Sequence, residues 1–144
     1  MNTSFEEIYP LFFAQIDDYT FAQADEDAVL SELEKYLSNS YLTFYSIMQG
    51  LDIDLVNKQF SRQLVMIEKL MIAKAMAAEW LLKKLNSEEL MVKAIGDRDY
   101  NAVQGFGYLK QLRAEYDAKI KDLDRSKIDY TYLNEEMSSD LFNG

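Results

Sequence analysis

The side chains in this chain that offer chemistry are carboxylates, because its 144 residues include neither histidine nor cysteine. Two pairs of acids lie close together, Glu88 with Glu89 and Asp97 with Asp99. A calcium loop needs further oxygen ligands at fixed spacing and a closing Glu, and this segment lacks both. Helix capping accounts for the two aspartates. The sequence therefore predicts no metal and no other cofactor.

The missing residue types also argue against an enzyme. Histidine is the commonest general base, and histidine and cysteine supply the usual nucleophile–base pairs and transition-metal ligands. The segment Gly105-Phe106-Gly107 is not a phosphate loop, because it lacks the Gly-Lys-Ser/Thr ending and follows no predicted strand. Its glycines indicate a bend or a close backbone contact. A carboxylate-dependent enzyme needs acids that converge in a pocket, and the spacing supplies none. We predict that the protein is not an enzyme.

The charge balance is strongly acidic. There are 25 acidic and 15 basic residues, a net charge of −10, and no basic residue precedes Lys35. Binding of nucleic acid by phosphate neutralisation needs clustered Lys and Arg, so this class of function is excluded. Three interpretations remain: a solvated acidic surface, a repulsive wall past which DNA slides without specific binding, or a decoy that imitates DNA.

Size and composition indicate one helical domain. Apolar residues make up 49% of the chain, which suits a folded core. The absence of cysteine leaves the reducing cytosol as the default compartment. The first residues lack the basic and apolar regions of a signal peptide. The most apolar stretch, residues 64–85, is interrupted in its middle by four charged residues, Glu68, Lys69, Lys74 and Glu79, so we predict a buried core helix and no membrane span.

Helical periodicity dominates a sequence with one proline and five glycines. We predict an all-α fold, a bundle of about four to five helices with a long core helix. The expected helices span residues 5–16 (capped within Asn2-Thr3-Ser4, with a kink or a break at Pro10), 25–50, 61–85, 87–96 and 100–128. Residues 51–60 are expected to form a loop or a helical turn. The helix over residues 61–85 is apolar nearly all round, so other helices or a neighbouring subunit must cover it.

A subunit interface is a second expectation. The chain contains 10 Tyr and 8 Phe, and tyrosine suits half-buried interfaces because it joins an apolar ring to a polar tip. Four large side chains are the candidate interface residues: Met71, Trp80, Phe106 and Tyr116.

The last residues form the most informative segment. We divide the chain into a helical bundle domain, residues 1–128, and an extended C-terminal arm, residues 129–144. The arm is short and acidic, yet it carries six large apolar or aromatic side chains: Tyr130, Tyr132, Leu133, Met137, Leu141 and Phe142. Such a segment needs a partner surface, on its own domain or on a neighbouring subunit. We predict that truncation after Ile128 leaves the fold intact and abolishes assembly.

Residues 60–134 contain four ordered segments that resemble a known family. They are Ala77-Ala78-Glu79-Trp80-Leu81, Gly96-Asp97-Arg98-Asp99-Tyr100, Leu109-Lys110-Gln111-Leu112-Arg113-Ala114-Glu115-Tyr116 and Asp129-Tyr130-Thr131-Tyr132-Leu133-Asn134. In order and pattern they resemble the head–tail connector, or neck adaptor, proteins of tailed bacteriophages.

This resemblance implies a structural protein of the virion neck, assembled in the host cytoplasm. Such adaptors form a ring, typically of twelve subunits, that docks beneath the portal protein and extends the DNA channel. The implied partners are other copies of the chain, the portal and a downstream neck or tail protein, with an arm that engages the portal or a neighbour. The alternative is a small acidic protein-binding module, such as a DNA-mimic inhibitor or a regulator.

Overall fold

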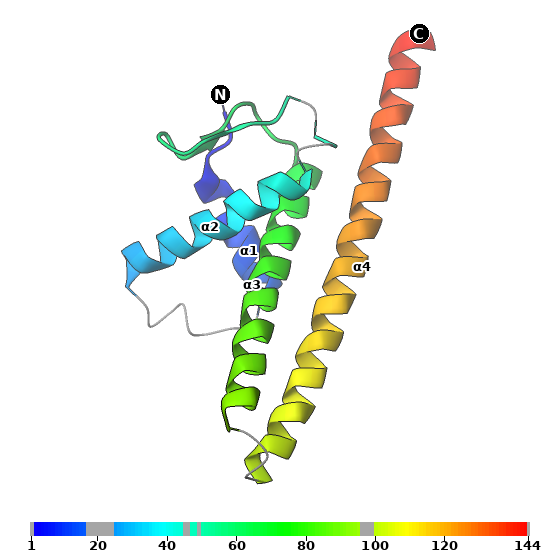
Figure 1. Cartoon of the computed structure of the whole chain (residues 1–144). Helices are drawn as coiled ribbons and strands as arrows, with labels where there is room; N and C mark the ends of the chain where they lie inside the picture. The colour runs from blue at the N-terminus through cyan, green and yellow to red at the C-terminus, as the bar shows by residue number, and fades with distance from the viewer. Residues whose placement is uncertain (1, 17–24, 45–46, 49, 96–99, 144) are drawn as a thin grey trace.

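The computed structural model describes residues 2–16, 25–44, 47–48, 50–95 and 100–143, with the backbone alone for 91–95, 100–106 and 134–143. Four α-helices and one small hairpin make up this part of the chain (Figure 1). The elements are η1 (Phe5–Glu7, one 3-10 turn), α1 (Tyr9–Gln15), α2 (Glu26–Phe44), β1 (Ile53–Asp54), β2 (Gln59–Phe60), α3 (Met66–Ile95) and α4 (Tyr100–Asn143). The predicted all-α helical bundle is confirmed.

The N-terminal turn begins as the sequence predicts. Ser4 accepts a hydrogen bond from the Glu6 backbone, and the Glu7 carboxylate accepts one from the Ser4 backbone at 2.9 Å. This reciprocal pair is a capping box. Pro10 lies in the first turn of α1, where its missing N–H is not needed, so it starts a helix there.

The expected loop over residues 51–60 is in fact a β-hairpin. Ile53 pairs with Phe60 and Asp54 with Gln59, in antiparallel register. The N-terminal segment extends this sheet, because Phe60 donates a hydrogen bond to the Thr3 carbonyl at 2.8 Å. Strands of two residues are too short to give an alternating pattern, so periodicity could not predict them.

Helix α3 runs without a break through Asn86 and Ser87, where the sequence predicted the end of one helix and the start of the next. Neither residue breaks a helix, since each costs only about 0.5 kcal/mol relative to alanine in a helix interior. The turn before them carries Leu85, which is buried against α4, and the turn after them carries Glu89, which pairs with Arg113 of α4. Packing against α4 on both sides of the predicted break explains why α3 continues.

The predicted extended arm is wrong, because α4 runs without interruption to Asn143. At 1.5 Å per residue, its 44 residues span about 65 Å. The predicted domain boundary at residue 128 falls inside this helix. Thr131 donates a side-chain hydrogen bond to the Lys127 carbonyl one turn earlier, at 2.9 Å, as Ser126 does to Asp122.

The core has two parts along α3. The larger part joins η1, α1, α2, the hairpin and the first half of α3, and receives Leu123 and Tyr130 from α4. The smaller part lies between the second half of α3 and the start of α4, where Leu81 and Leu85 pack with Leu109 and Leu112. The first half of α3 is therefore surrounded, whereas its second half depends on α4.

Two glycines offer a matched test of the backbone. Gly50 has a φ of 72°, which disfavours any residue with a Cβ, whereas Gly107 lies inside α4; neither would place an added Cβ within 4 Å of another atom. We expect Gly50→Ala to lower the free energy of unfolding by about 1 kcal/mol. Gly107→Ala should raise it by about 0.5–1 kcal/mol. Urea denaturation measures both, and a loss of stability in Gly107→Ala would contradict the open space around Gly107.

Candidate assembly surface

The acidic side chains that the sequence brings together do not gather into a metal site in the described part of the chain. No group of three or more acidic side chains among them could hold a metal ion. Of the predicted acidic cluster, Asp97 and Asp99 lie outside the described residues, and Glu89 forms an ion pair with Arg113. Each buried polar side-chain atom in the described part of the chain has a hydrogen-bond partner.

One buried cluster fixes the C-terminal part of α4. Glu68, in the first turn of α3, accepts two hydrogen bonds from Arg62, at 3.0 and 2.6 Å, and one from the Val65 backbone at 3.0 Å. Tyr130 of α4 donates to the same carboxylate at 2.7 Å. We call Arg62, Glu68 and Tyr130 the Glu68 cluster. It ties residue 130 to the start of α3.

The Glu68 cluster is electrostatically matched. Burial acts to raise the pKa of Glu68, but hydrogen bonds from Arg62, the Val65 N–H and Tyr130 outweigh it, and the pKa is lowered from its ordinary value. The Arg62 guanidinium is partly exposed to solvent. The other two donors to the carboxylate, the Val65 N–H and the Tyr130 hydroxyl, are uncharged. The charged form of Glu68 is therefore the one that holds α4 in place.

Tyr130 is thus part of the core and not part of a free arm. Only 6% of its surface is exposed, and it packs within the larger core cluster. One turn before Tyr130, the Lys127 ammonium lies 5.5 Å from the centre of the Phe44 ring at the end of α2. Lys74 of α3 reaches both Asp122 and Ser126, each at 3.2 Å. These contacts hold α4 against the bundle as far as residue 130.

The outer face of the same turns is apolar and exposed. Ile128 is 69% exposed and Tyr132 62%, and Leu133 is also exposed. A shallow hollow of about 340 Å³ lies here, and the described residues that line it are Lys127, Ile128, Thr131 and Tyr132. We call it the α4 hollow.

Beyond Tyr130, α4 continues for 13 residues, or about 20 Å. Tyr130 binds the first turn of α3, so the part of α4 that follows it extends beyond the N-terminal end of α3. This part projects above the rest of the chain in Figure 1. The predicted arm residues Met137, Leu141 and Phe142 belong to it. Their backbone is helical, and their side chains lie outside the described residues.

The four predicted interface residues have different positions. Met71 is buried in the core of its own chain, so that prediction is wrong, while Phe106 has a side chain outside the described residues. Trp80 and Tyr116 are half-buried beside the smaller core. Trp80 also lines a groove of about 500 Å³ with Tyr108. Over this groove the Lys84 ammonium lies 5.1 Å from the centre of the Trp80 ring.

Sequence reasoning missed a second exposed apolar feature. The turn between β1 and β2 carries Leu55 and Val56, which we call the hairpin tip, and Val56 is 88% exposed. The signal was present in the sequence, since Asp54 precedes and Asn57 follows these residues, and both types favour turns. Because the segment was expected to form a loop or a helical turn, its exposed apolar side chains were not predicted.

Comparison with protein-family models, with curated proteins and with solved structures found no match. Among the described residues, no helix has the length and apolar character needed to cross a bilayer. The functional assignment therefore rests on the sequence pattern and on the surfaces described above.

Proposed function

We propose that this protein is a structural adaptor of the head–tail connector class of tailed bacteriophages. In this proposal its copies form a ring beneath the portal that extends the DNA channel and joins the head to a neck or tail protein. The protein acts by binding and not by catalysis. The single observation that carries the proposal is the C-terminal end of α4, which projects about 20 Å beyond the contact that fixes it.

A projecting helix end is only marginally stable unless a partner packs against it. Isolated helical segments of this length are marginal in water, so a partner that packs against residues 134–143 would stabilise them. The segment is apolar and acidic in sequence, with Met137, Leu141 and Phe142 among Glu135, Glu136 and Asp140. Small contacts of this kind become long-lived when they repeat around a closed ring. The resemblance of residues 60–134 to neck adaptors supports the same conclusion.

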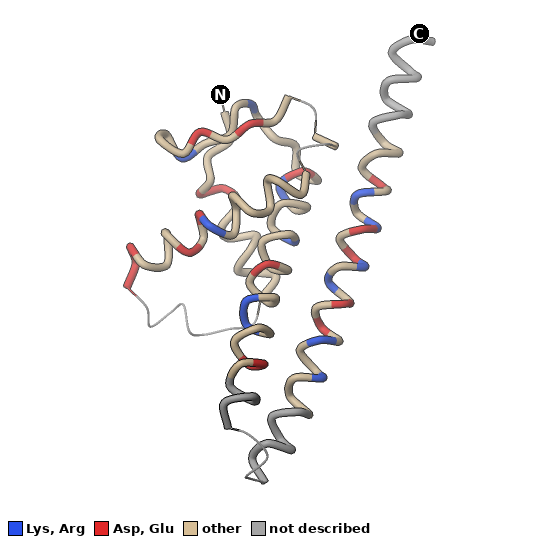
Figure 2. Tube along the Cα trace, in the orientation of Figure 1, with Lys and Arg blue, Asp and Glu red and all other residues tan. Residues whose placement is uncertain are grey.

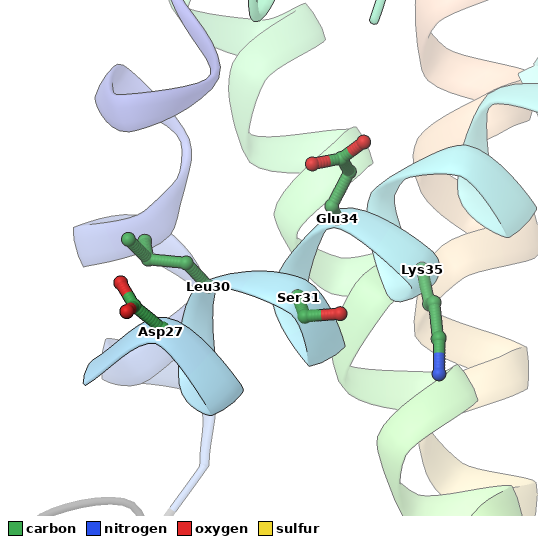
Figure 3. Close-up of a pocket in the computed structure, with 5 residues that line it drawn as sticks. All are labelled: Asp27, Leu30, Ser31, Glu34 and Lys35. Atoms are coloured by element: carbon green, nitrogen blue, oxygen red, sulfur yellow. The ribbon is translucent and has the colours of Figure 1, made fainter. Parts of the chain in front are cut away.

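The alternative function is a small acidic module that imitates DNA. Its best support is the outer face of α2, where Asp27, Leu30, Ser31, Glu34 and Lys35 border a shallow hollow of about 390 Å³ (Figure 3). Several N-terminal acids, however, are already neutralised within the chain. Glu34 pairs with Lys58, as Glu32 does with Lys83 and Glu7 with Lys69. This pairing favours the adaptor over a DNA mimic, which needs rows of free carboxylates.

The mass of the purified protein in solution, alone and mixed with a candidate portal protein, tests the proposal. We expect a ring, or a stable complex with the portal, by light scattering coupled to size-exclusion chromatography. If the protein does not bind the portal and instead competes with DNA for a host enzyme, the adaptor proposal is contradicted and the acidic module is supported.

A further inference from the structure

The hairpin tip is a fixed apolar knob. The Asp54 carboxylate accepts hydrogen bonds from the backbones of Val56 and Asn57, at 3.0 and 3.1 Å, and from the Asn57 side chain at 2.7 Å. These bonds close the turn that presents Leu55 and Val56 to solvent. A rigid turn loses little conformational entropy when it binds.

The base of the tip is held in an uncommon conformation. Lys58 has a φ of 54°, in the left-handed region that residues other than glycine rarely adopt. Its carbonyl accepts a hydrogen bond from the Phe5 backbone at 3.0 Å, and its ammonium bonds Glu34 of α2 at 2.6 Å. Backbone strain that the surrounding structure maintains points to a functional constraint on what the turn presents.

The α4 hollow is the apolar counterpart of this tip. Ile128 and Tyr132 supply apolar surface, and its size of about 340 Å³ can accommodate a side chain such as Val56. In Figure 1 the hairpin turn and α4 lie on opposite sides of α2 and α3. A knob and a hollow on opposite sides of one molecule meet in a head-to-tail contact between copies, and such contacts close into rings or extend as filaments.

Charge favours the same arrangement. Residues 1–60, which include α2 and the hairpin, contain 11 of the 25 acidic residues but only 2 of the 15 basic residues, and they stay in acidic excess although Glu7, Glu32 and Glu34 pair with lysines. Residues 107–133 of α4 contain 6 basic and 5 acidic residues, interspersed along the helix in Figure 2. Two acidic sides repel each other, so a symmetric contact through the hairpin side is disfavoured, whereas the acidic side can approach α4.

We propose that the hairpin tip of one copy docks into the α4 hollow of the next copy, with Val56 packed against Ile128 and Tyr132. This inference rests on the proposed function in that it names the contact between neighbouring subunits of the ring. It assigns the projecting end of α4, beyond the hollow, to a different partner. Each contact is small, so the assembly depends on ring closure for its stability.

Cross-linking tests the contact directly, because the natural chain has no cysteine. Val56→Cys and Thr131→Cys proteins, each purified alone, are mixed and treated with a short bis-maleimide. We expect a cross-linked dimer from the mixture and a ladder of higher species from the doubly substituted chain. The matched control is Leu30→Cys mixed with Thr131→Cys, because Leu30 is an exposed apolar residue on the same acidic side. That control should give no dimer.

Three results overturn the contact: equal yield from the Leu30 control, a dimer from Val56→Cys protein alone, or no dimer above background. A second variant, Val56→Asp, changes an exposed side chain and should fold normally while it weakens self-association about tenfold. If Val56→Asp builds the same ring on the portal as the natural chain, the hairpin contact is wrong and the adaptor function stands. If the natural chain neither self-associates nor binds the portal, the adaptor function itself fails.

Discussion

Replacing Glu68 with alanine is expected to lower the free energy of unfolding by about 3 kcal/mol. The change removes the acceptor for four hydrogen bonds, from Arg62, Val65 and Tyr130. It leaves the buried Tyr130 hydroxyl without this partner and the start of α3 without its side-chain cap. Urea denaturation of the variant against the natural chain measures the loss. The control is Asp117→Ala, an exposed acidic residue of α4, which should change stability by less than about 0.5 kcal/mol.

A double-mutant cycle separates the contact between helices from the local effects. Tyr130→Phe removes the hydroxyl and keeps the ring, so it should cost about 1.5–2 kcal/mol, as hydrogen bonds to charged groups do. Combined with Glu68→Gln, it should cost less than the two single changes together, because both act on one bond. Full additivity would mean that Tyr130 and Glu68 do not interact in solution.

The same cluster makes stability depend on pH. The pKa of Glu68 is lowered in the folded chain by its hydrogen bonds from Arg62, the Val65 N–H and Tyr130, despite burial, so folding favours the charged carboxylate. This contribution is complete well above the ordinary value of 4.5 and is lost as the pH falls through the lower folded value. Glu7 and Glu32 also have lowered pKa values, from the Ser4 backbone bond and the Lys83 bond respectively. We expect Glu68→Gln to lose part of the acid dependence below pH 4.5 and to keep the remainder.

Local rules predicted the start of helices better than their ends. Ser4 with Glu7 specifies a capping box through neighbours in sequence, and the structure contains it. The break at Ser87 was inferred from the same kind of local signal, but Leu85 and Glu89 contact α4, which is distant in sequence. A weak local preference loses to tertiary packing of this kind. The hairpin was missed for another reason, since its strands are shorter than any period that could reveal them.

In the candidate site, too, residue type was predictable from the sequence but tertiary contacts were not. Tyr130 and Tyr132 are equivalent to a reader of the sequence, yet one is buried against Glu68 and the other is exposed beside Ile128. How much of a helix is covered along its length depends on where the neighbouring helix ends. The first turn of α3 lies beside residue 130, so the covered part of α4 ends there. Sequence could identify a segment that needs a partner, but not that its first aromatic residue had found one.

This position of Tyr130 changes what truncation should do. Removal of residues 129–144 deletes the Tyr130 ring and hydroxyl, so we expect a chain that ends at Ile128 to be destabilised by at least about 3 kcal/mol. The earlier expectation, that this truncation leaves the fold intact, does not fit the Glu68 cluster. Thermal unfolding followed by circular dichroism compares the truncated and natural chains. Unchanged stability would show that the Glu68 cluster contributes little.

A chain that ends at Leu133 provides the matched comparison. It keeps Tyr130 and the α4 hollow and removes only the projecting end, so its stability should remain within about 1 kcal/mol of the natural chain. Under the proposed function it should still cross-link through Val56 and residue 131, yet fail to bind the portal or the next neck protein. The two truncations then assign separate tasks to α4. Residues up to 130 complete the fold, residues 127–132 receive the next copy, and residues 134–143 reach a different protein; retained portal binding by the chain ending at Leu133 would place that surface elsewhere.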